Sequence, residues 1–225
     1  MDYPIWLALE DFVPVFFGLA GFILLSRLSG RPAGFAGALL IGLGGLSKCA
    51  WKLSVAAGGG DPRLLEEALF PLMAAGATLL TWSLAIAVRR GRRVHFWPFA
   101  VVFGLGVAGS VLAQSLHPMF VVATFGVTAV SVLGAIIAGR YRQWWAVSLF
   151  VLGLVLVTSL VPLRGSAKHE TVAYQWLEQS LNTSAQLALL IAAWLTLLAF
   201  RRAAAPPPAD SPAVRPAVRP VGETA

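Results

Sequence analysis

The sequence predicts an all-α integral membrane protein with seven transmembrane helices. Apolar residues make up 58% of its 225 residues and charged residues only 12%, whereas soluble globular domains carry about 25% charged residues. The apolar residues lie in long runs separated by short polar turns, and one spanning helix takes about 20 residues. A chain of this length therefore has room for roughly six to eight spans in one domain, and none for a separate soluble domain.

Charged or Gly- and Pro-rich turns separate seven apolar runs. We expect spans at Asp11 to Leu28, Gly34 to Ala57, Leu64 to Val88, Phe96 to Leu116, Met119 to Ala138, Trp144 to Leu163 and Val172 to Phe200. Asp61 and Pro62 are typical of the N-cap and first position of a helix. Residues 1–202 form the transmembrane domain, and the Ala- and Pro-rich residues 203–225 are expected to be a disordered tail, because they have too little apolar bulk to fold.

The basic residues of the short loops fall mostly on one side of the expected membrane. That side holds Arg27, Arg31, Arg89, Arg90, Arg92, Arg93, Arg140, Arg142, Arg201 and Arg202, and the other side holds Arg63, Arg164 and Lys168. Cytoplasmic loops carry the excess of Lys and Arg, so we expect a bacterial inner (plasma) membrane protein with its N-terminus outside and its C-terminus in the cytoplasm. Met1 to Phe12 contain no basic residue, so a cleaved signal peptide is not expected.

The net charge of +7 comes from these loop clusters rather than from one exposed basic face. The expected partner is therefore the lipid bilayer and not a nucleic acid. His95, His117 and His169 fall in loops without the spacing of zinc motifs, and the single Cys49 excludes an intramolecular disulfide or a CxxC motif. The sequence also lacks a P-loop and a serine nucleophile elbow. We expect no metal and no cofactor, and the sequence leaves the oligomeric state open.

An internal repeat relates the first three expected spans to the last three. The matched pairs are Glu66 with Glu178, Trp82 with Trp194, Arg89 and Arg90 with Arg201 and Arg202, Gly21 with Gly134, and Gly42 with Gly153. The repeat units are about 11–90 and 119–202, and the helix at about 96–116 links them. This 3+1+3 arrangement makes the repeats parallel, because three helices reverse the chain and one more crossing restores its direction. Parallel repeats place ligand sites near their shared interface in many transporters.

Polar residues of three spans are expected to meet in the outer half of the bundle. The candidate ligand-binding or ion-relay residues are Lys48, Trp51, Lys52, Glu66, Glu67, Trp176, Glu178, Gln179, Asn182 and Gln186. Ionisable residues inside a membrane usually face the bundle and mark function. We expect Lys48 and Glu178 to approach each other, either lining a functional cavity or as a structural pair that holds span two to span seven. The polar residues of span seven are also typical of hydrogen bonding between membrane helices.

Three limited resemblances follow from these patterns. The 3+1+3 arrangement resembles SWEET-type sugar transporters in architecture, although their Pro-Gln loop signature is absent. The segment Leu65 to Phe70, echoed by Leu177 to Leu181, is similar to the Pro-x-Glu-Glu segments of membrane lycopene cyclases, with the proline missing. The region of Trp51 is similar to the Trp-Glu pair of small membrane terpene cyclases, but Lys52 stands where their acid would be. Both local resemblances cover short segments, and no family is assigned.

Three functions remain open from the sequence. The first is a small-molecule carrier or ligand-binding membrane protein, with a small polar or amphipathic ligand held in the charged cavity. The second is a membrane-embedded enzyme that acts on an isoprenoid or lipid, with Glu66 or Glu178 as general acid; the neighbouring lysines disfavour it, because a nearby cation favours the charged carboxylate. The third is a structural or assembly protein without a ligand.

Overall fold

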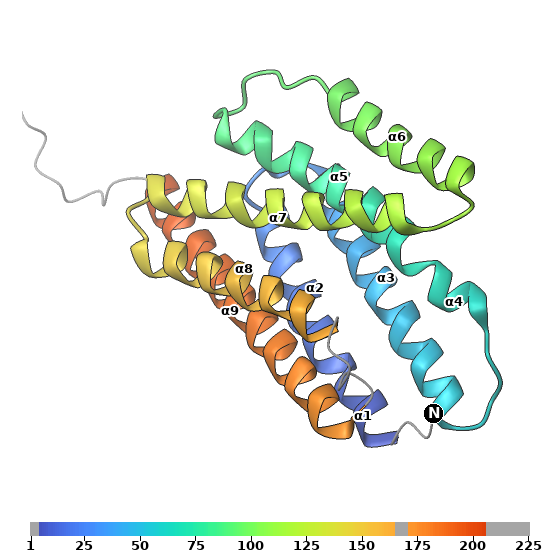
Figure 1. The fold of residues 1–225 in the computed structure, drawn as a ribbon. Helices are drawn as coiled ribbons and strands as arrows, with labels where there is room; N and C mark the ends of the chain where they lie inside the picture. Colours follow the sequence, from blue (N-terminus) through green and yellow to red (C-terminus); the bar gives the residue numbers. More distant parts are fainter. Residues whose placement is uncertain (1–4, 165–170, 206–225) are drawn as a thin grey trace, which may run out of the picture.

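The computed structural model describes residues 5–164 and 171–205, which fold into α-helices without any strand (Figure 1). The helices are α1 (Ile5–Glu10), α2 (Phe12–Ser26), α3 (Pro32–Ala56), α4 (Arg63–Glu67), α5 (Leu69–Val88), α6 (Trp97–Ala113), α7 (His117–Arg140), α8 (Trp144–Arg164) and α9 (Val172–Ala204). The all-α prediction is confirmed for this part of the chain. The predicted tail begins at residue 203, but α9 continues to Ala204. Residues 206–225, and the loop residues Lys168 and His169, lie outside the described residues.

Five helical segments are long and apolar enough to cross a membrane. They are Ile5–Ser26, Pro32–Ala56, Arg63–Val88, His117–Arg140 and Val172–Ala204. The apolar helix α6 and the apolar part of α8, Trp144–Leu160, are shorter. Large apolar side chains are exposed on the outside of the bundle, including Leu112 and Phe125, and such surface suits lipid rather than water. The described residues therefore contain five helical segments with the length and apolarity of membrane spans, as in an integral membrane protein.

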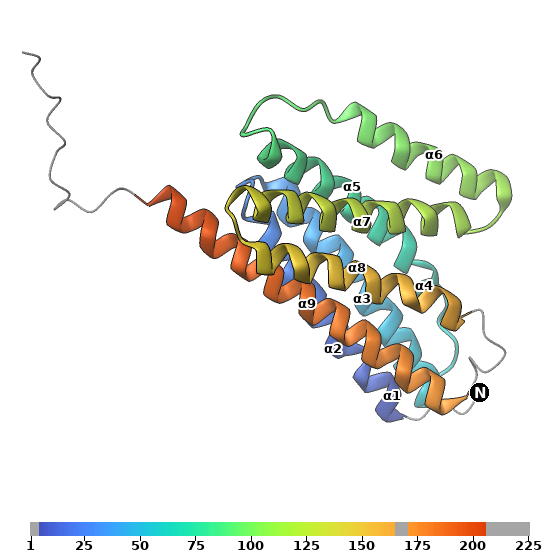
Figure 2. The ribbon, with the colours of Figure 1, turned by 60° about the vertical axis from the view of Figure 1, so that its left-hand side comes forward.

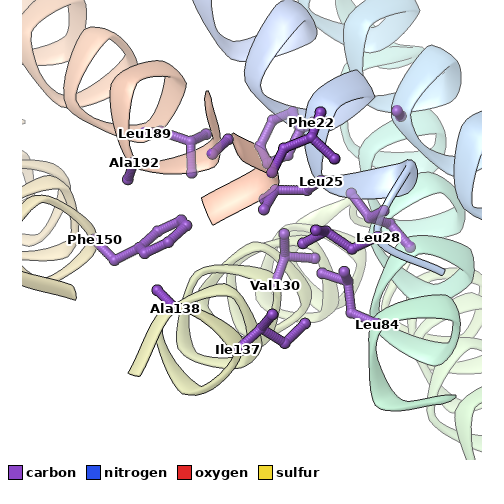
Figure 3. Close-up of a cluster of buried hydrophobic side chains, with 14 of the residues drawn as sticks. Phe22, Leu25, Leu28, Leu84, Val130, Ile137, Ala138, Phe150, Leu189 and Ala192 are labelled. Atoms are coloured by element: carbon purple, nitrogen blue, oxygen red, sulfur yellow. The ribbon is translucent and has the colours of Figure 1, made fainter. Parts of the chain in front are cut away.

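Six helical segments close into a ring, with one helix outside it (Figures 1 and 2). In order around the ring, α2 packs on α3, α3 on α5, α5 on α7, α7 on α8, α8 on α9, and α9 on α2. Helix α6 packs against α7 and α5 from outside. The apolar core lies inside the ring, where Leu25, Leu84, Val130 and Leu189 meet from four different helices (Figure 3).

Helices α3 and α5 make the closest crossing of the ring, at two glycines. A Cβ atom placed on Gly76 would lie 2.5 Å from the carbonyl oxygen of Gly37, and one placed on Gly37 would lie 2.6 Å from the carbonyl oxygen of Gly76. Small residues at such a crossing let two membrane backbones approach, and van der Waals packing then holds the helices together. This contact holds α3 against α5, and α3 carries Lys48 and Lys52, the two lysines of the expected site.

The two ends of the bundle carry opposite charges. At one end, which we call the acidic end, lie α1, the C-terminus of α3, α4 and the N-terminus of α9, with Glu10, Asp11, Asp61, Glu66, Glu67 and Glu178. At the other, the basic end, lie the C-termini of α2, α5, α7 and α9, with Arg27, Arg89, Arg90, Arg140, Arg201 and Arg202. All six carboxylates of the described residues therefore lie at the acidic end.

Candidate functional site

The first membrane helix is broken at Asp11, within its apolar segment. Helix α1 ends at Glu10 and α2 begins at Phe12. Pro14 explains the break, because proline has no N–H to donate and its ring clashes with the carbonyl four residues earlier, here that of Glu10. The prediction that this span begins at Asp11 is wrong: helix already starts at Ile5, so both acids lie inside the apolar segment and Asp11 is buried, with 7% of its surface exposed.

The third membrane helix is broken in the same way. Helix α4 ends at Glu67, Ala68 interrupts the helix and α5 begins at Leu69. Pro71 stands three residues after the break, just as Pro14 does after Asp11, and disrupts the hydrogen bond to the carbonyl of Glu67. Each broken helix therefore carries two consecutive acidic residues beside its break, at the acidic end of the bundle.

Two lysines of α3 bind one acid from each broken helix. Lys52 Nζ lies 2.5 Å from Asp11 Oδ2, and Lys48 Nζ lies 2.8 Å from Glu66 Oε1. The lysines are four residues apart and so project from one face of α3. The pair of Lys52 and Asp11 is the more buried, since these side chains are 18% and 9% exposed. Helix α3 thus joins the two breaks by ion pairs.

Helix α9 completes this cluster from the other side of α1 and α2. The Gln179 side-chain amide donates a hydrogen bond to Asp11 Oδ1, and the Thr183 hydroxyl donates one to Glu10 Oε1 at 2.7 Å. Glu178, the residue before Gln179, is half-buried at the same end of α9. We call Glu10, Asp11, Lys48, Lys52, Glu66, Gln179 and Thr183 the polar network. Its centre is Asp11, which is bound from both α3 and α9.

An indole ring extends the network toward the end of the bundle. Lys48 Nζ lies 4.1 Å from the centroid of the Trp51 ring, within the range of a cation–π interaction. Trp51 Nε1 donates a hydrogen bond to Asp61 Oδ1 at 2.7 Å. The Trp51 ring is therefore held between the Lys48 ammonium and the loop that precedes α4.

The expected pairing of Lys48 with Glu178 is wrong, because Lys48 pairs with Glu66. The reason is the order of the helices. Helix α2 packs between α3 and α9 (Figures 1 and 2), so the acids nearest to the lysines of α3 come from the broken helices rather than from α9.

The other predicted site residues lie around the network or outside it. Gln186 lies deeper on α9, with its buried Oε1 atom facing Gly18. Asn182 is half-buried, and Glu67 and Trp176 are exposed. The structure thus brings together Lys48, Trp51, Lys52, Glu66 and Gln179, and it does not bring Glu67 or Trp176 into the same cluster.

Sequence reasoning missed Glu10 and Asp11, although the sequence holds a signal for them. The predicted first span begins at Asp11, which places Glu10 outside the span and Asp11 at its first position. However, apolar residues flank them on both sides, at 5–9 and 12–17, and Pro14 follows. Two acids in an apolar segment, followed by a proline, indicate a broken membrane helix with a buried carboxylate.

Two neighbouring cavities, which share two lining residues, lie at the opposite, basic end. One has a volume of about 420 Å³ and lies between the C-terminal ends of α2, α5, α7 and α9, where Leu28, Arg90, Ile137, Arg140 and Phe200 are among its lining residues. The other has a volume of about 540 Å³ and is lined by Val88, Arg89, Arg90, Arg92 and Arg140. Arg90 and Arg140 line both cavities, so these arginines mark their shared boundary.

Within the described residues, the fold and this site define an all-helical membrane protein with two broken helices and a buried ion pair between Asp11 and Lys52. The chain matches no family model, no curated protein and no solved structure. Within residues 5–164 and 171–205, no three His, Cys, Asp or Glu side chains come together as metal ligands.

Proposed function

We propose that the protein is a carrier for a small polar or amphipathic molecule, closed at the acidic end and open at the basic end. The observation that carries the proposal is the polar network, which ties two broken helices to α3 and α9. Broken helices form the ligand sites of many transporters, and intramembrane ionisable residues mark substrate and ion pathways. The cavity between α2, α5, α7 and α9 supplies the open end.

An apolar layer separates the network from the cavity. Phe22, Leu25, Leu84 and Val130 lie between them along the helices and are buried in the core (Figure 3). A ligand in the cavity therefore reaches the acidic end only if groups of helices move relative to each other. Alternating access by rocking of two repeats supplies such a movement.

We propose that all seven apolar helices cross the membrane in a 3+1+3 repeat. In this repeat, α2 corresponds to α7, α3 to α8 and α5 to α9. If each helix is exchanged with its counterpart, the order of neighbours around the ring stays the same, as a repeat requires. Helix α6, the linker, lies outside the ring, and its 17 residues fall within the range of spanning helices. The aligned glycines Gly21 and Gly134 do not support the repeat, because they do not face equivalent helices: Gly21 faces α9, whereas Gly134 faces Phe150 of α8.

We further propose that the acidic end faces outward and the basic end faces the cytoplasm of a bacterial cell. Reporter fusions after Arg93 and Arg142 are expected to give cytoplasmic signals, and a fusion at Gly60 an external one, because Lys and Arg concentrate in cytoplasmic loops. Paired reporters that are active on opposite sides of the membrane provide the measurement. A cytoplasmic signal at Gly60 would reverse the orientation and place the polar network on the inner side.

The closed acidic end is tested with Cys49, which is only 3% exposed and whose Sγ atom lies 3.3 Å from the backbone oxygen of Asp11. If ion pairs hold this end closed, the double variant Lys48→Ala/Glu66→Ala should label several-fold faster at Cys49 with a membrane-impermeant maleimide. Removing both partners leaves no unpaired charge, so the fold should survive. The measurement is the labelling rate in proteoliposomes, with thermal unfolding recorded in parallel.

Arg63→Ala is the matched control, because Arg63 pairs with Asp61 at the same end but both side chains are largely exposed. Its labelling rate should equal that of the unchanged protein. Equal labelling rates in the unchanged protein, the double variant and Arg63→Ala would contradict a gate, that is, an acidic end held closed by ion pairs. Faster labelling of the double variant together with a lowered unfolding temperature would indicate that the Lys48–Glu66 pair has a structural role. A second experiment distinguishes a carrier from a membrane enzyme. Molecules that copurify with the protein are extracted and identified by mass spectrometry: a polar solute supports a carrier, and an isoprenoid supports the enzyme.

A further inference from the structure

We propose that the basic end contains a binding site for a phosphate group, formed by Arg89, Arg90, Arg92 and Arg140. These four arginines are exposed and, with Val88, line an open groove of about 540 Å³ at the ends of α5 and α7. Guanidinium groups match phosphate oxygens with two parallel hydrogen bonds, and several of them around one cavity are suited to a doubly or singly charged phosphate.

The backbone after α5 brings three of these arginines together. Arg90 and Gly91 both adopt positive φ angles, of 52° and 80°, which reverse the chain within a few residues. Three backbone hydrogen bonds hold the turn: Arg90 N–H to Ala87, Gly91 N–H to Ile86 and Arg92 N–H to Arg89. This is the left-handed C-terminal cap common at helix ends, which also ends α6 at Gln114 and α7 at Arg142, and here it keeps Arg90 and Arg92 next to Arg89.

Helix α7 contributes the fourth arginine in a fixed place. Arg140, the last residue of α7, donates a hydrogen bond from Nη1 to the carbonyl oxygen of Val88 at the end of α5. This bond anchors the base of the cavity and joins the two helices that form its walls.

The charge of this cluster is not balanced by the described part of the chain. The carboxylates of residues 5–164 and 171–205 all lie at the acidic end, and so do the ion pairs formed among these residues. The C-terminal ends of α5 and α7 supply about half a negative charge each. Four guanidinium groups therefore leave a positive surplus, which an external anion can neutralise.

The neighbouring cavity indicates that the phosphate belongs to a lipid. It shares Arg90 and Arg140 but is otherwise lined largely by apolar residues, among them Leu28, Ile86 and Phe200. Apolar walls beside a basic cluster suit an acyl chain beside a headgroup, and basic pockets between membrane helices bind anionic lipid headgroups. The acyl chain would occupy the cavity that forms the open end of the proposed carrier, and binding of the lipid there is measured without transport.

The test compares binding of phosphatidylglycerol and of inorganic phosphate to the full chain in detergent, by native mass spectrometry and by the shift in unfolding temperature. The variant Arg89→Gln/Arg92→Gln keeps Arg140 and its bond to α5. Its affinity for phosphatidylglycerol should fall about 30-fold, or about 2 kcal/mol, which is the contribution of two basic residues beside anionic lipid. Arg201→Gln/Arg202→Gln, which also removes two charges at the basic end but lies outside the cavity lining, should keep the original affinity.

If the unchanged protein binds inorganic phosphate and the Arg89→Gln/Arg92→Gln variant does not, the phosphate site is supported and its ligand is a soluble phosphate rather than a lipid. Equal affinities of the unchanged protein and the Arg89→Gln/Arg92→Gln variant would overturn the site. An equal loss in the Arg201→Gln/Arg202→Gln control would also overturn it, because the attraction would then come from the basic end as a whole. Because Cys49 labelling tests the gate at the opposite end, failure of one proposal is distinguishable from failure of the other.

Discussion

Replacing Lys52 by methionine should destabilise the folded protein by about 3–5 kcal/mol, because the buried Asp11 carboxylate then loses its ion-pair partner. The hydrogen bond from Gln179 remains but supplies no positive charge. The double variant Asp11→Leu/Lys52→Met should recover most of the loss, since apolar residues can replace a buried ion pair with little effect on stability. The measurement is the free energy of unfolding in detergent micelles, followed by circular dichroism.

Lys48→Met is the control for this prediction. Lys48 and Glu66 are 29% and 42% exposed, so breaking their pair should cost only about 1 kcal/mol or less. A loss for Lys52→Met no larger than that for Lys48→Met would show that burial does not distinguish the two pairs. Failure of the double variant to recover would mean that Asp11 stabilises the fold through partners other than Lys52.

The substitution Gly76→Ala should separate α3 from α5 and destabilise the protein by about 1–3 kcal/mol or more, the range for an overpacked core. The added Cβ atom would lie 2.5 Å from the carbonyl oxygen of Gly37 and 2.8 Å from the backbone nitrogen of Ile41. Both are backbone atoms of α3, so no flexible side chain can move aside. The same measurement of unfolding in detergent applies.

Gly104→Ala provides the matched control for this crossing. Gly104 lies on α6, and a Cβ atom placed there meets nothing within 4 Å. Alanine is intrinsically the better helix former, by about 1 kcal/mol, so this variant should be neutral or slightly more stable. A destabilisation of Gly104→Ala as large as that of Gly76→Ala would contradict the explanation by close helix contact.

The acidic break of the first helix shows why the sequence located only part of the site. Lys48, Lys52 and Glu66 were identified because charged residues in apolar segments are costly and therefore conspicuous. The sequence prediction places the start of the first span at Asp11, whereas the helix begins at Ile5 and Pro14 breaks it at Asp11. The sequence held the signal, but its meaning depended on where the helix begins.

The sequence by itself determined the all-helical membrane class, the approximate positions of the apolar helices and the separation of acidic from basic residues. These properties follow from hydropathy and charge along the chain, which act locally on each helix in a bilayer. Tertiary structure alone decided which charges pair. Lys48 binds Glu66, and Lys52 binds Asp11, because α2 lies between α3 and α9. The strength of an ion pair depends on distances of a few ångströms, and the order of the helices in the bundle sets those distances.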